Sequence, residues 1–358
     1  MDIVTHGLAS LAVARAFFPR AGKAGIASAL IAGTLADIDW LSAFFGPSAF
    51  FGWHGTYTHS ILATVLISAV FPAILVAAIF WGWLGIDVSL PRGEAIPNDP
   101  RTMRNLALRN LFGAALLAPL CAALLHIAMD ACQSDGVALL WPFRDERIAA
   151  DWLPGLDPWI LVILIAAMAL PELLHLVSSE IGAKEKRPRG QRGAIIGLAF
   201  VLVYVGARAT LHSNAVAMLQ ARTYRSETPR RVGAFPESVS LLTWQGIVET
   251  ESALHEIAVD VTVGGSFNPE SGVNLYKPEP SSLLEAARNT AAAKAFLRVA
   301  RFPKAAVQTT AAGYVVELRD LRYAAVRETQ HEIAVVVELD SAGKVTSESF
   351  VWARDLHR

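Results

Sequence analysis

The sequence is poor in charged residues. Asp, Glu, Lys and Arg make up 18% of its 358 residues, whereas a soluble globular chain carries about a quarter. The deficit is concentrated in residues 1–219, which hold long apolar runs, while residues 220–358 have the composition of an ordinary soluble domain. The net charge is -1, so no excess of basic over acidic residues suggests nucleic-acid binding. The sequence therefore predicts two domains, a transmembrane one at 1–219 and a soluble one at 220–358.

Cysteine is scarce as well, since Cys121 and Cys132 are the only two. Both lie in or beside an apolar run, which argues against a disulfide framework and leaves the redox compartment open. The first residues contain no basic segment and no nearby cleavage site, so we expect no removable signal peptide. A Gly-rich phosphate loop, a nucleophile elbow and a Cys-x-x-Cys pair are also missing, which leaves nucleotide, serine-hydrolase and thiol chemistry without support.

Apolar segments long enough to cross a bilayer dominate the first domain. A span needs about 20 mostly apolar residues, and four segments reach this length: 60–84, 106–130, 157–179 and 193–219. Two more, 6–18 and 24–45, are shorter or interrupted, and either form a tight first hairpin across the membrane or lie partly in its interface. We expect a mainly α-helical, polytopic bundle of about six transmembrane helices.

The basic residues of the loops predict how this bundle is oriented. One set of loops holds Arg15, Arg20, Lys23, Arg92, Arg101, Arg104, Lys184, Lys186, Arg187, Arg189 and Arg192. The opposite loops, 46–58 and 131–156, hold only Arg144 and Arg147. Cytoplasmic loops carry the excess of Lys and Arg. We therefore expect an inner-membrane protein whose two termini and soluble domain lie on the non-cytoplasmic side.

Histidines and aspartates cluster at the ends of the apolar segments. They are His6, Asp37, Asp39, His54, His59, His126 and Asp130. His126 and Asp130 are four residues apart and therefore share one helix face. The predicted orientation brings all seven side chains to the non-cytoplasmic membrane face. Each residue alone has an ordinary explanation as a cap, an interfacial side chain or a structural hydrogen bond, but their convergence at one depth indicates a site.

Neutral imidazole combined with carboxylate suits zinc, and less specifically manganese or iron. Seven candidate ligands exceed the three or four that one catalytic zinc takes, so two or more divalent ions are expected. Such a cluster can activate water and stabilise the attacking and leaving oxygens of a phosphoester. Among the same residues, Asp39 and Asp130 are candidates to accept a proton during catalysis. Arg208, four residues from His212 in the last segment, either grips a substrate anion or extends toward the interface.

The same residues resemble the motifs of the YdjM/YbcI type of membrane-bound metal-dependent hydrolases. The matching pieces are Thr5-His6, Ala36-Asp37-Ile38-Asp39, His54-Gly55-x-x-Thr58-His59-Ser60, and His126-x-x-x-Asp130 followed by Gly136, Leu140 and Trp141-Pro142-Phe143. One departure is that Gly55 follows His54 directly, where that family usually has Arg-Gly. The tail is similar to longer members through Trp244, Val248-Glu249 and Asp320-Leu321-Arg322-Tyr323. The order of the motifs is also similar to the zinc-dependent phospholipase C family, which implies a phosphoester substrate.

The sequence of the soluble domain, 220–358, predicts an α+β fold. It contains no recognisable catalytic motif. Residues 220–234 have the composition of a linker, and 239–250 with 253–263 alternate as a β-hairpin does. An Ala-rich helix is expected at 281–300, and strands at 305–310, 313–319, 332–339 and 345–353. This domain is expected to shape substrate access or to bind a partner.

The leading hypothesis is a membrane-embedded metal-dependent hydrolase acting on a phosphoester of a membrane lipid or another amphiphile. A zinc-dependent lipid amidase is the alternative enzyme. The alternative outside the enzymes is a metal-stabilised membrane scaffold whose tail recruits partners. Neither the substrate, the identity of the metal nor the oligomeric state follows from the sequence.

Overall fold

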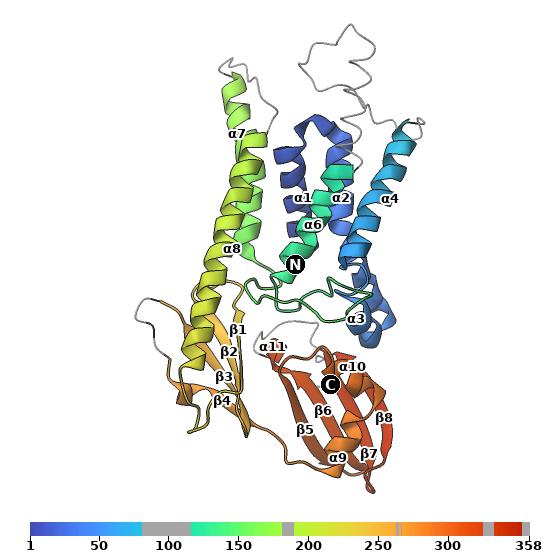
Figure 1. The fold of residues 1–358 in the computed structure, drawn as a ribbon, viewed down its shortest axis with the longest axis vertical. Helices are drawn as coiled ribbons and strands as arrows, with labels where there is room; N and C mark the ends of the chain where they lie inside the picture. The colour runs from blue at the N-terminus through green and yellow to red at the C-terminus, as the bar shows by residue number, and fades with distance from the viewer. Residues whose placement is uncertain (81–115, 181–189, 263–264, 266, 325–332, 353–358) are drawn as a thin grey trace. The chain divides into compact units, whose positions relative to one another are not determined.

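The structure is a computed structural model that describes residues 1–80, 116–180, 190–262, 265, 267–324 and 333–352 (Figure 1). The chain forms two compact units. The first consists of Met1–Asp39 and Gly55–Ala207, and the second of Trp40–His54 and Arg208–Arg358. The chain therefore crosses from one unit to the other three times, and each unit is described by itself.

The first unit is helical. Its elements are α1 (Ile3–Phe17), the 3-10 turn η1 (Pro19–Ala21), α2 (Gly22–Leu35), the start of the 3-10 helix η2 (Ala36–Phe45), α4 (Ile61–Phe80), α6 (Ala118–Ala131), α7 (Pro158–Glu180) and the first part of α8 (Gln191–Gln220). Six helices thus stand at the six segments expected from the sequence. In the part of the chain that the structure describes, two stretches, Gly25–Phe45 and Gln191–Gln220, are long and apolar enough to cross a membrane. Residues 81–115 and 181–189, which carry most of the basic loops and parts of two expected spans, lie outside the described residues.

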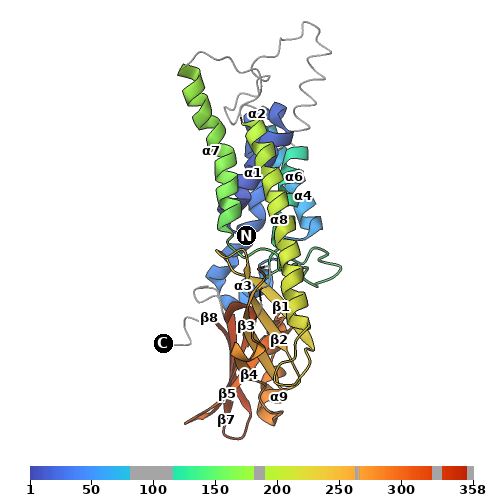
Figure 2. The ribbon, with the colours of Figure 1, turned by 90° about the vertical axis from the view of Figure 1, so that its left-hand side faces the viewer.

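Helix α6 lies among α1, α2 and α4 and contacts all three (Figures 1 and 2). The helices approach closely because small residues line their contacts, as is usual between membrane helices. Ala14, Ala29, Ala118 and Ala122 form one such buried cluster. Helices α7 and α8 use glycine in the same way: a Cβ added at Gly197 would lie 2.4 Å from the Cβ of Ala167.

The second unit contains two four-stranded antiparallel sheets. The first sheet has the order β1 (Arg231–Pro236), β2 (Thr243–Glu249), β3 (Ala253–Asp260) and β4 (Val273–Tyr276). The second has the order β5 (Pro303–Thr310), β6 (Gly313–Asp320), β7 (Ile333–Asp340) and β8 (Val345–Trp352). Between them come η4 (Pro269–Ser271), α9 (Ser282–Arg288) and α10 (Ala291–Leu297), and α11 (Leu321–Ala324) follows β6. The expected hairpin and the four later strands are confirmed.

Each sheet of the second unit has its own apolar core. Ala215 and Leu219, at the end of α8, are fully buried with Trp244 and Val248 of the first sheet. Leu284 of α9 and Phe296 of α10 pack with Val316, Val337 and other residues of the second sheet. The hydrophobic effect therefore explains why Val316 and Leu318 of β6, and Val335, Val337 and Leu339 of β7, are apolar at alternate positions.

Two predictions for the soluble part were wrong in detail. The expected linker ends early, because β1 begins at Arg231 and pairs with β2 over its whole length. Gly233 and Pro236 obscure this strand in the sequence, although an edge strand tolerates both. The expected helix at 281–300 is two helices, since the side chain of Thr290 accepts a hydrogen bond from Ala293 N and starts a new helix.

The second unit also includes a segment from the N-terminal half of the chain. Residues Trp40–His54 contain the end of η2 and the helix α3 (Pro47–Trp53). The ring of Phe51 packs against Phe296 and Phe350, with centroids 5.9 and 5.4 Å away. The segment therefore belongs to the core of the second sheet, although the sequence places it between two metal-ligand motifs.

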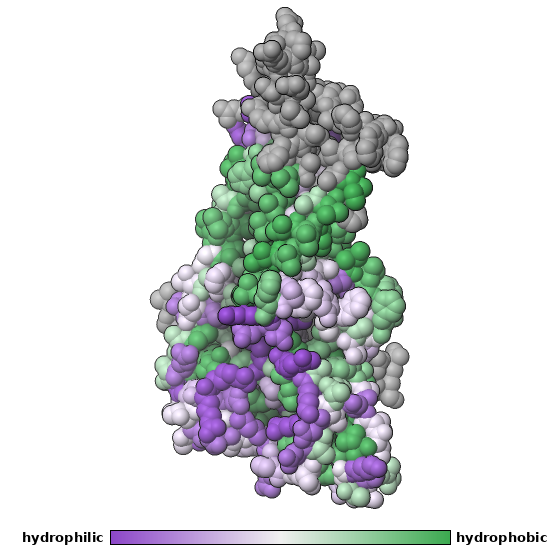
Figure 3. Space-filling view, turned by 45° about the vertical axis from the view of Figure 1, so that its right-hand side comes forward, coloured by the Kyte–Doolittle hydropathy of each residue, from purple (hydrophilic) through white to green (hydrophobic). Residues whose placement is uncertain are grey.

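The surface reflects the difference in composition between the units. In the space-filling view, hydrophobic residues gather over the helices of the first unit (Figure 3). The sheets of the second unit expose mainly hydrophilic and mixed residues in the same view. Many helix residues that face outward are large and apolar, among them Phe200, Leu202 and Val203 of α8, which are 61%, 74% and 70% exposed. Such a surface is expected of helices that face lipid.

Candidate metal centre

Three local structures of the first unit present His6, Asp37, Asp39, His126 and Asp130. The side chain of Asp2 accepts hydrogen bonds from Val4 N and Thr5 N and caps α1, so that His6 lies in the first turn. Asp37 and Asp39 lie in the first turn of η2, where the α-helix tightens. His126 and Asp130 lie one turn apart on α6. These five residues are thus held by a helix end or a helix face rather than by a long loop.

His6, Asp37, His126 and Asp130 are all buried, and one ligand atom of each lies within 4.8 Å of those of the other three. Asp130 is at the centre of the group. Its Oδ1 lies 3.1 Å from Nε2 of His6, and its Oδ2 lies 3.1 Å from Nε2 of His126. Oδ1 of Asp37 lies 3.7 Å from Nε2 of His126. The rings of His6 and His126 are stacked with centroids 3.7 Å apart.

His59 lies beside this group and stays a candidate fifth ligand. Its Nε2 lies 3.2 Å from Oδ2 of Asp130 and 3.2 Å from Nε2 of His126. Burial opposes a charge on the imidazole, but hydrogen bonds with Asp130 and Asp39 outweigh burial and raise the pKa of His59 to about 9. Two carboxylates thus face opposite nitrogens of the His59 ring.

Asp39 lies behind His59. Its Oδ2 is 3.1 Å from Nδ1 of His59 and accepts hydrogen bonds from Gly55 N at 2.9 Å and from the Thr58 hydroxyl at 3.0 Å. A carboxylate bonded to the far nitrogen of a histidine fixes the tautomer and the orientation of a ligand ring. These contacts favour Asp39 as the residue that orients His59, although the sequence predicted it as a ligand.

The carbonyl of Gly33 orients His126. This oxygen lies 2.8 Å from Nδ1 of His126, which leaves Nε2 of the ring to face the carboxylates of Asp37 and Asp130. This contact requires α2 and α6 to approach closely. A Cβ added at Gly33 would lie 1.9 Å from Oγ of Ser10 and 3.3 Å from the Cβ of Ala122. Glycine at this position therefore permits the carbonyl to reach the histidine.

The chemistry and spacing of these side chains fit a divalent metal ion. Metal–ligand bonds of about 2.0–2.2 Å put neighbouring tetrahedral ligands roughly 3.4 Å apart, and the separations above run from 3.1 to 3.7 Å. Among the described residues, Oδ2 of Asp37 and Nδ1 of His6 are buried without a hydrogen-bond partner. An unpaired buried carboxylate oxygen is costly, and a cation would compensate for it.

The other predicted site residues lie in the second unit. The ring of His54 is stacked on Phe50, with centroids 4.7 Å apart, and meets the edge of Trp40. Arg208 is buried, donates hydrogen bonds to the carbonyls of Ser240 and Leu241, and lies over the ring of Trp244. The roles predicted for His54 as a ligand and for Arg208 as an anion-binding residue stay predictions.

Sequence reasoning missed three parts of the centre. These are the Gly33 carbonyl, the Ser10 hydroxyl that donates to His6 O at 2.7 Å, and the amide of Gln133, which donates to Oδ1 of Asp130 at 3.3 Å. The α-amino group of Met1 also lies 2.5 Å from Oδ1 of Asp130. Gln133 follows Asp130 by three residues and lies just beyond the end of α6 at Ala131, so its closeness in the sequence is the one available signal.

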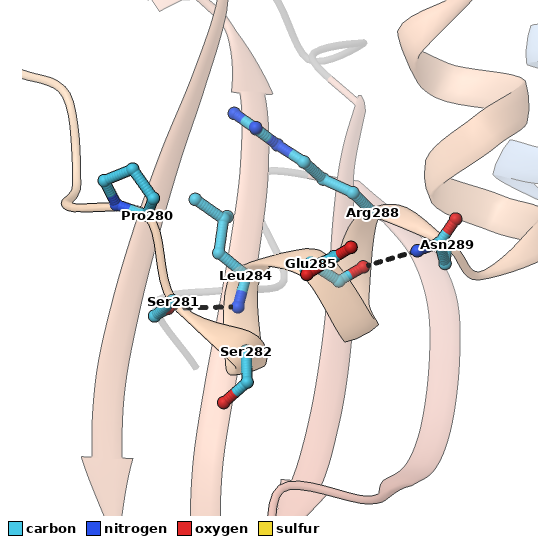
Figure 4. Close-up of a pocket in the computed structure, with 7 residues that line it drawn as sticks. All are labelled: Pro280, Ser281, Ser282, Leu284, Glu285, Arg288 and Asn289. Atoms are coloured by element: carbon cyan, nitrogen blue, oxygen red, sulfur yellow. Dashed lines mark hydrogen bonds between the residues drawn. The ribbon is translucent and has the colours of Figure 1, made fainter.

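A hollow of about 440 Å³ lies beside α9, lined by Leu284, Glu285, Arg288 and other residues shown in Figure 4. Several of its polar groups serve the helix itself. Oγ of Ser281 accepts a hydrogen bond from Leu284 N, and the Asn289 amide donates to the Glu285 carbonyl. These bonds cap a helix of seven residues, and the hollow therefore lacks the converging ligands of the metal centre.

Helices with apolar outer faces and a buried cluster of histidine and aspartate define a membrane protein with a candidate metal site. A family model described as YdjM inner membrane protein matches residues 1–215. The chain therefore belongs to the YdjM family of inner membrane proteins, which confirms the resemblance found in the sequence. A second model, described as YfhP C-terminal alpha/beta plait domain, matches residues 282–358. No curated protein and no solved structure matches the chain significantly.

Proposed function

We propose that the chain is a membrane-embedded metal-dependent hydrolase. The observation that carries the proposal is the convergence of His6, Asp37, His126 and Asp130 within 4.8 Å inside the helical unit. Stability alone gives no reason to bury two carboxylates with histidines among membrane helices, because each charge is costly there. A catalytic metal centre accounts for that cost.

The individual residues support distinct roles in this centre. His6, Asp37, His59, His126 and Asp130 would hold the metal, and Asp39 and the Gly33 carbonyl orient two of the histidines. The two oxygens of Asp130 face different histidines, so Asp130 would be able to hold metal through either oxygen. When bound, a divalent metal lowers the pKa of water and polarises a phosphoryl or acyl oxygen.

Asp37 is the residue best placed to take up a proton. Its Oδ1 faces His126, while its Oδ2 is buried without a hydrogen-bond partner among the described residues. The sequence favoured Asp39 or Asp130 for this role. However, Oδ2 of Asp39 is engaged by Gly55, Thr58 and His59, and both oxygens of Asp130 face histidines. Oδ1 of Asp37 would then help to hold the metal, and its Oδ2 would be left to accept a proton as a general base.

The substrate class proposed is a phosphoester carried by a membrane lipid or another amphiphile. A site among membrane helices suits a substrate that arrives through the lipid, and zinc is the metal that best suits the mixture of imidazole and carboxylate. The proposed topology has six transmembrane helices, with the metal centre and the second unit on the non-cytoplasmic side. Support for this orientation comes from the distribution of basic residues in the loops.

Metal analysis combined with turnover tests the proposal. Purified wild-type protein should contain at least one equivalent of zinc, manganese or iron and should hydrolyse a lipid phosphoester. His126→Ala should lose both properties while remaining folded in detergent. A folded wild-type protein that takes up none of these metals would contradict the hydrolase proposal.

Two alternatives use the same cluster. A zinc-dependent lipid amidase would release a fatty acid from an amide-linked lipid and leave phosphoesters intact, so the two substrates distinguish the enzymes. A metal-stabilised scaffold would bind metal without turnover. For that alternative, His126→Ala would lower the unfolding temperature and leave membrane lipid composition unchanged.

A further inference from the structure

The segment Trp40–His54 contains no Asp, Glu, Lys or Arg, and six of its fifteen residues are Phe or Trp. Three of these aromatic rings pack within the second unit. Phe51 contacts Phe296 and Phe350, Phe50 lies 5.7 Å from the ring of Trp352, and Trp40 lies 5.1 Å from the ring of Phe50. This packing explains part of the apolar composition of the segment.

The remaining large side chains face outward. Phe44 and Phe45 are 86% and 80% exposed, and Leu41 and Trp53 are more than half exposed. Gly46 has φ +99°, a value that only glycine adopts readily, and Pro47 starts α3 directly after it. The exposed pair therefore directly precedes the glycine that separates η2 from α3.

We propose that this face, consisting of Leu41, Phe44, Phe45 and Trp53, inserts into the interface of the lipid bilayer. Phe44 and Phe45 are the last residues of Gly25–Phe45, one of the stretches long and apolar enough to cross a membrane. The exposed face thus continues directly from a candidate span. Aromatic side chains without nearby charge are the residues found at the ends of membrane spans and on interfacial helices. The segment would bind lipid with one face and the second unit with the other.

This inference does not depend on hydrolase activity or on a bound metal. It concerns how the second unit is attached to the membrane, because Phe51, next to the exposed face, packs against Phe296 of α10 and Phe350 of β8. Bilayer lipid is favoured over a second copy of the chain because the face continues from a candidate membrane span in a member of an inner membrane protein family.

Spin labels test the proposal in the full chain. Phe45→Cys and Trp53→Cys are made separately in a Cys121→Ala/Cys132→Ala background and reconstituted into nanodiscs of phosphatidylethanolamine and phosphatidylglycerol. Collisions with oxygen, which concentrates in lipid, are compared with collisions with a water-soluble nickel chelate. Leu202→Cys, on the exposed face of α8, is the lipid reference, and Thr309→Cys, exposed on β5, is the water reference.

The oxygen-to-nickel ratio at both test positions should be several-fold higher than at Thr309→Cys and should approach that at Leu202→Cys. A ratio equal to the water reference would overturn the proposal. Low accessibility to both reagents would also overturn it and would indicate a protein partner on this face. Substituting exposed side chains should leave the fold intact, and the circular dichroism spectrum of each variant checks this.

Discussion

Oδ2 of Asp39 lies 3.1 Å from Nδ1 of His59, on the side of the ring away from Asp130. The ring of His59 is therefore held between two carboxylates. A histidine held in this way presents a fixed Nε2 to a metal, with the basicity of the ring raised by the second carboxylate. The roles of the two aspartates differ, and this difference leads to the first prediction.

Asp39→Asn should weaken metal binding without abolishing it. Loss of a partner behind a ligand histidine costs roughly 10- to 100-fold in affinity, and His59 would keep its contact with Asp130. Competition with a chelator of known zinc affinity measures the change. An affinity loss as complete as that of Asp37→Asn would show that Asp39 is a ligand itself.

His126→Ala should remove metal binding more completely than Asp39→Asn, because the ring faces both Asp37 and Asp130. The expected loss of metal affinity is larger than the roughly 100-fold that removal of a residue behind a ligand causes. His54→Ala is the matched control, since its ring is stacked on Phe50 and meets Trp40. Metal content by mass spectrometry checks both variants, and loss of metal in His54→Ala would restore that residue to the ligand set predicted from the sequence.

Gly33→Ala should destabilise the helical unit and weaken the metal centre together. The added methyl group would meet Ser10 and Ala122, and overpacking of this kind costs about 1–3 kcal/mol. Displacement of α2 would also move the carbonyl away from His126. A second substitution, Ser10→Gly, makes room for the methyl group and should restore part of both properties. Thermal unfolding and metal titration of the single and double variants measure this, and no recovery in the double variant would argue against the packing explanation.

Arg208→Met should lower the unfolding free energy of the second unit by about 2–3 kcal/mol, because two part-buried hydrogen bonds from the buried guanidinium to the carbonyls of Ser240 and Leu241 are lost. Arg208→Lys keeps the charge but lacks the planar fork of donors, so it should be intermediate. Denaturant unfolding followed by tryptophan fluorescence checks the order. The catalytic role predicted from the sequence would instead lower turnover in both variants with unchanged unfolding free energies.

The hydrogen bonds of Glu227 predict that the stability of the second unit depends on pH. Its carboxylate accepts hydrogen bonds from the hydroxyl and the backbone N of Ser252, which lower the pKa of Glu227 to about 2. A lowered pKa means that the carboxylate stabilises the fold above about pH 4.5 and that this contribution is lost as the pH falls toward 2. The unfolding temperature of the wild type should therefore exceed that of Glu227→Gln at pH 7, and the difference should shrink below pH 4.5. A difference independent of pH would contradict this assignment.

Much of the site could be predicted from the sequence. The apolar segments and the charge of the loops predicted that His6, Asp37, His126 and Asp130 converge, because helices of bilayer length bring residues at their ends to one depth. The spacing of His126 and Asp130 also predicted their shared face correctly.

The finer arrangement could not be predicted. Spacing does not determine whether Asp37 or Asp39 turns toward the cluster, since both lie in one 3-10 turn and small rotations decide the outcome. The Gly33 carbonyl leaves no side-chain signal at all. The sequence predicted the end of a membrane segment at residue 45 and an outer loop at 46–58, and not a segment packed on the second sheet. The partners of Phe51, Phe296 and Phe350, lie about 250 to 300 residues later in the chain, and no local pattern indicates so distant a contact.

Helix α8 has a practical consequence for dissecting the protein. Its last thirteen residues, from Arg208 to Gln220, belong to the second unit, and Ala215 and Leu219 complete the core around Trp244. A truncated chain that begins at residue 220 would leave those apolar side chains behind and expose an unfilled groove on the first sheet. A fragment of the second unit should therefore begin before Arg208 and carry the end of the helix with it, and it would still lack Phe51 of the segment Trp40–His54, which packs against Phe296 and Phe350.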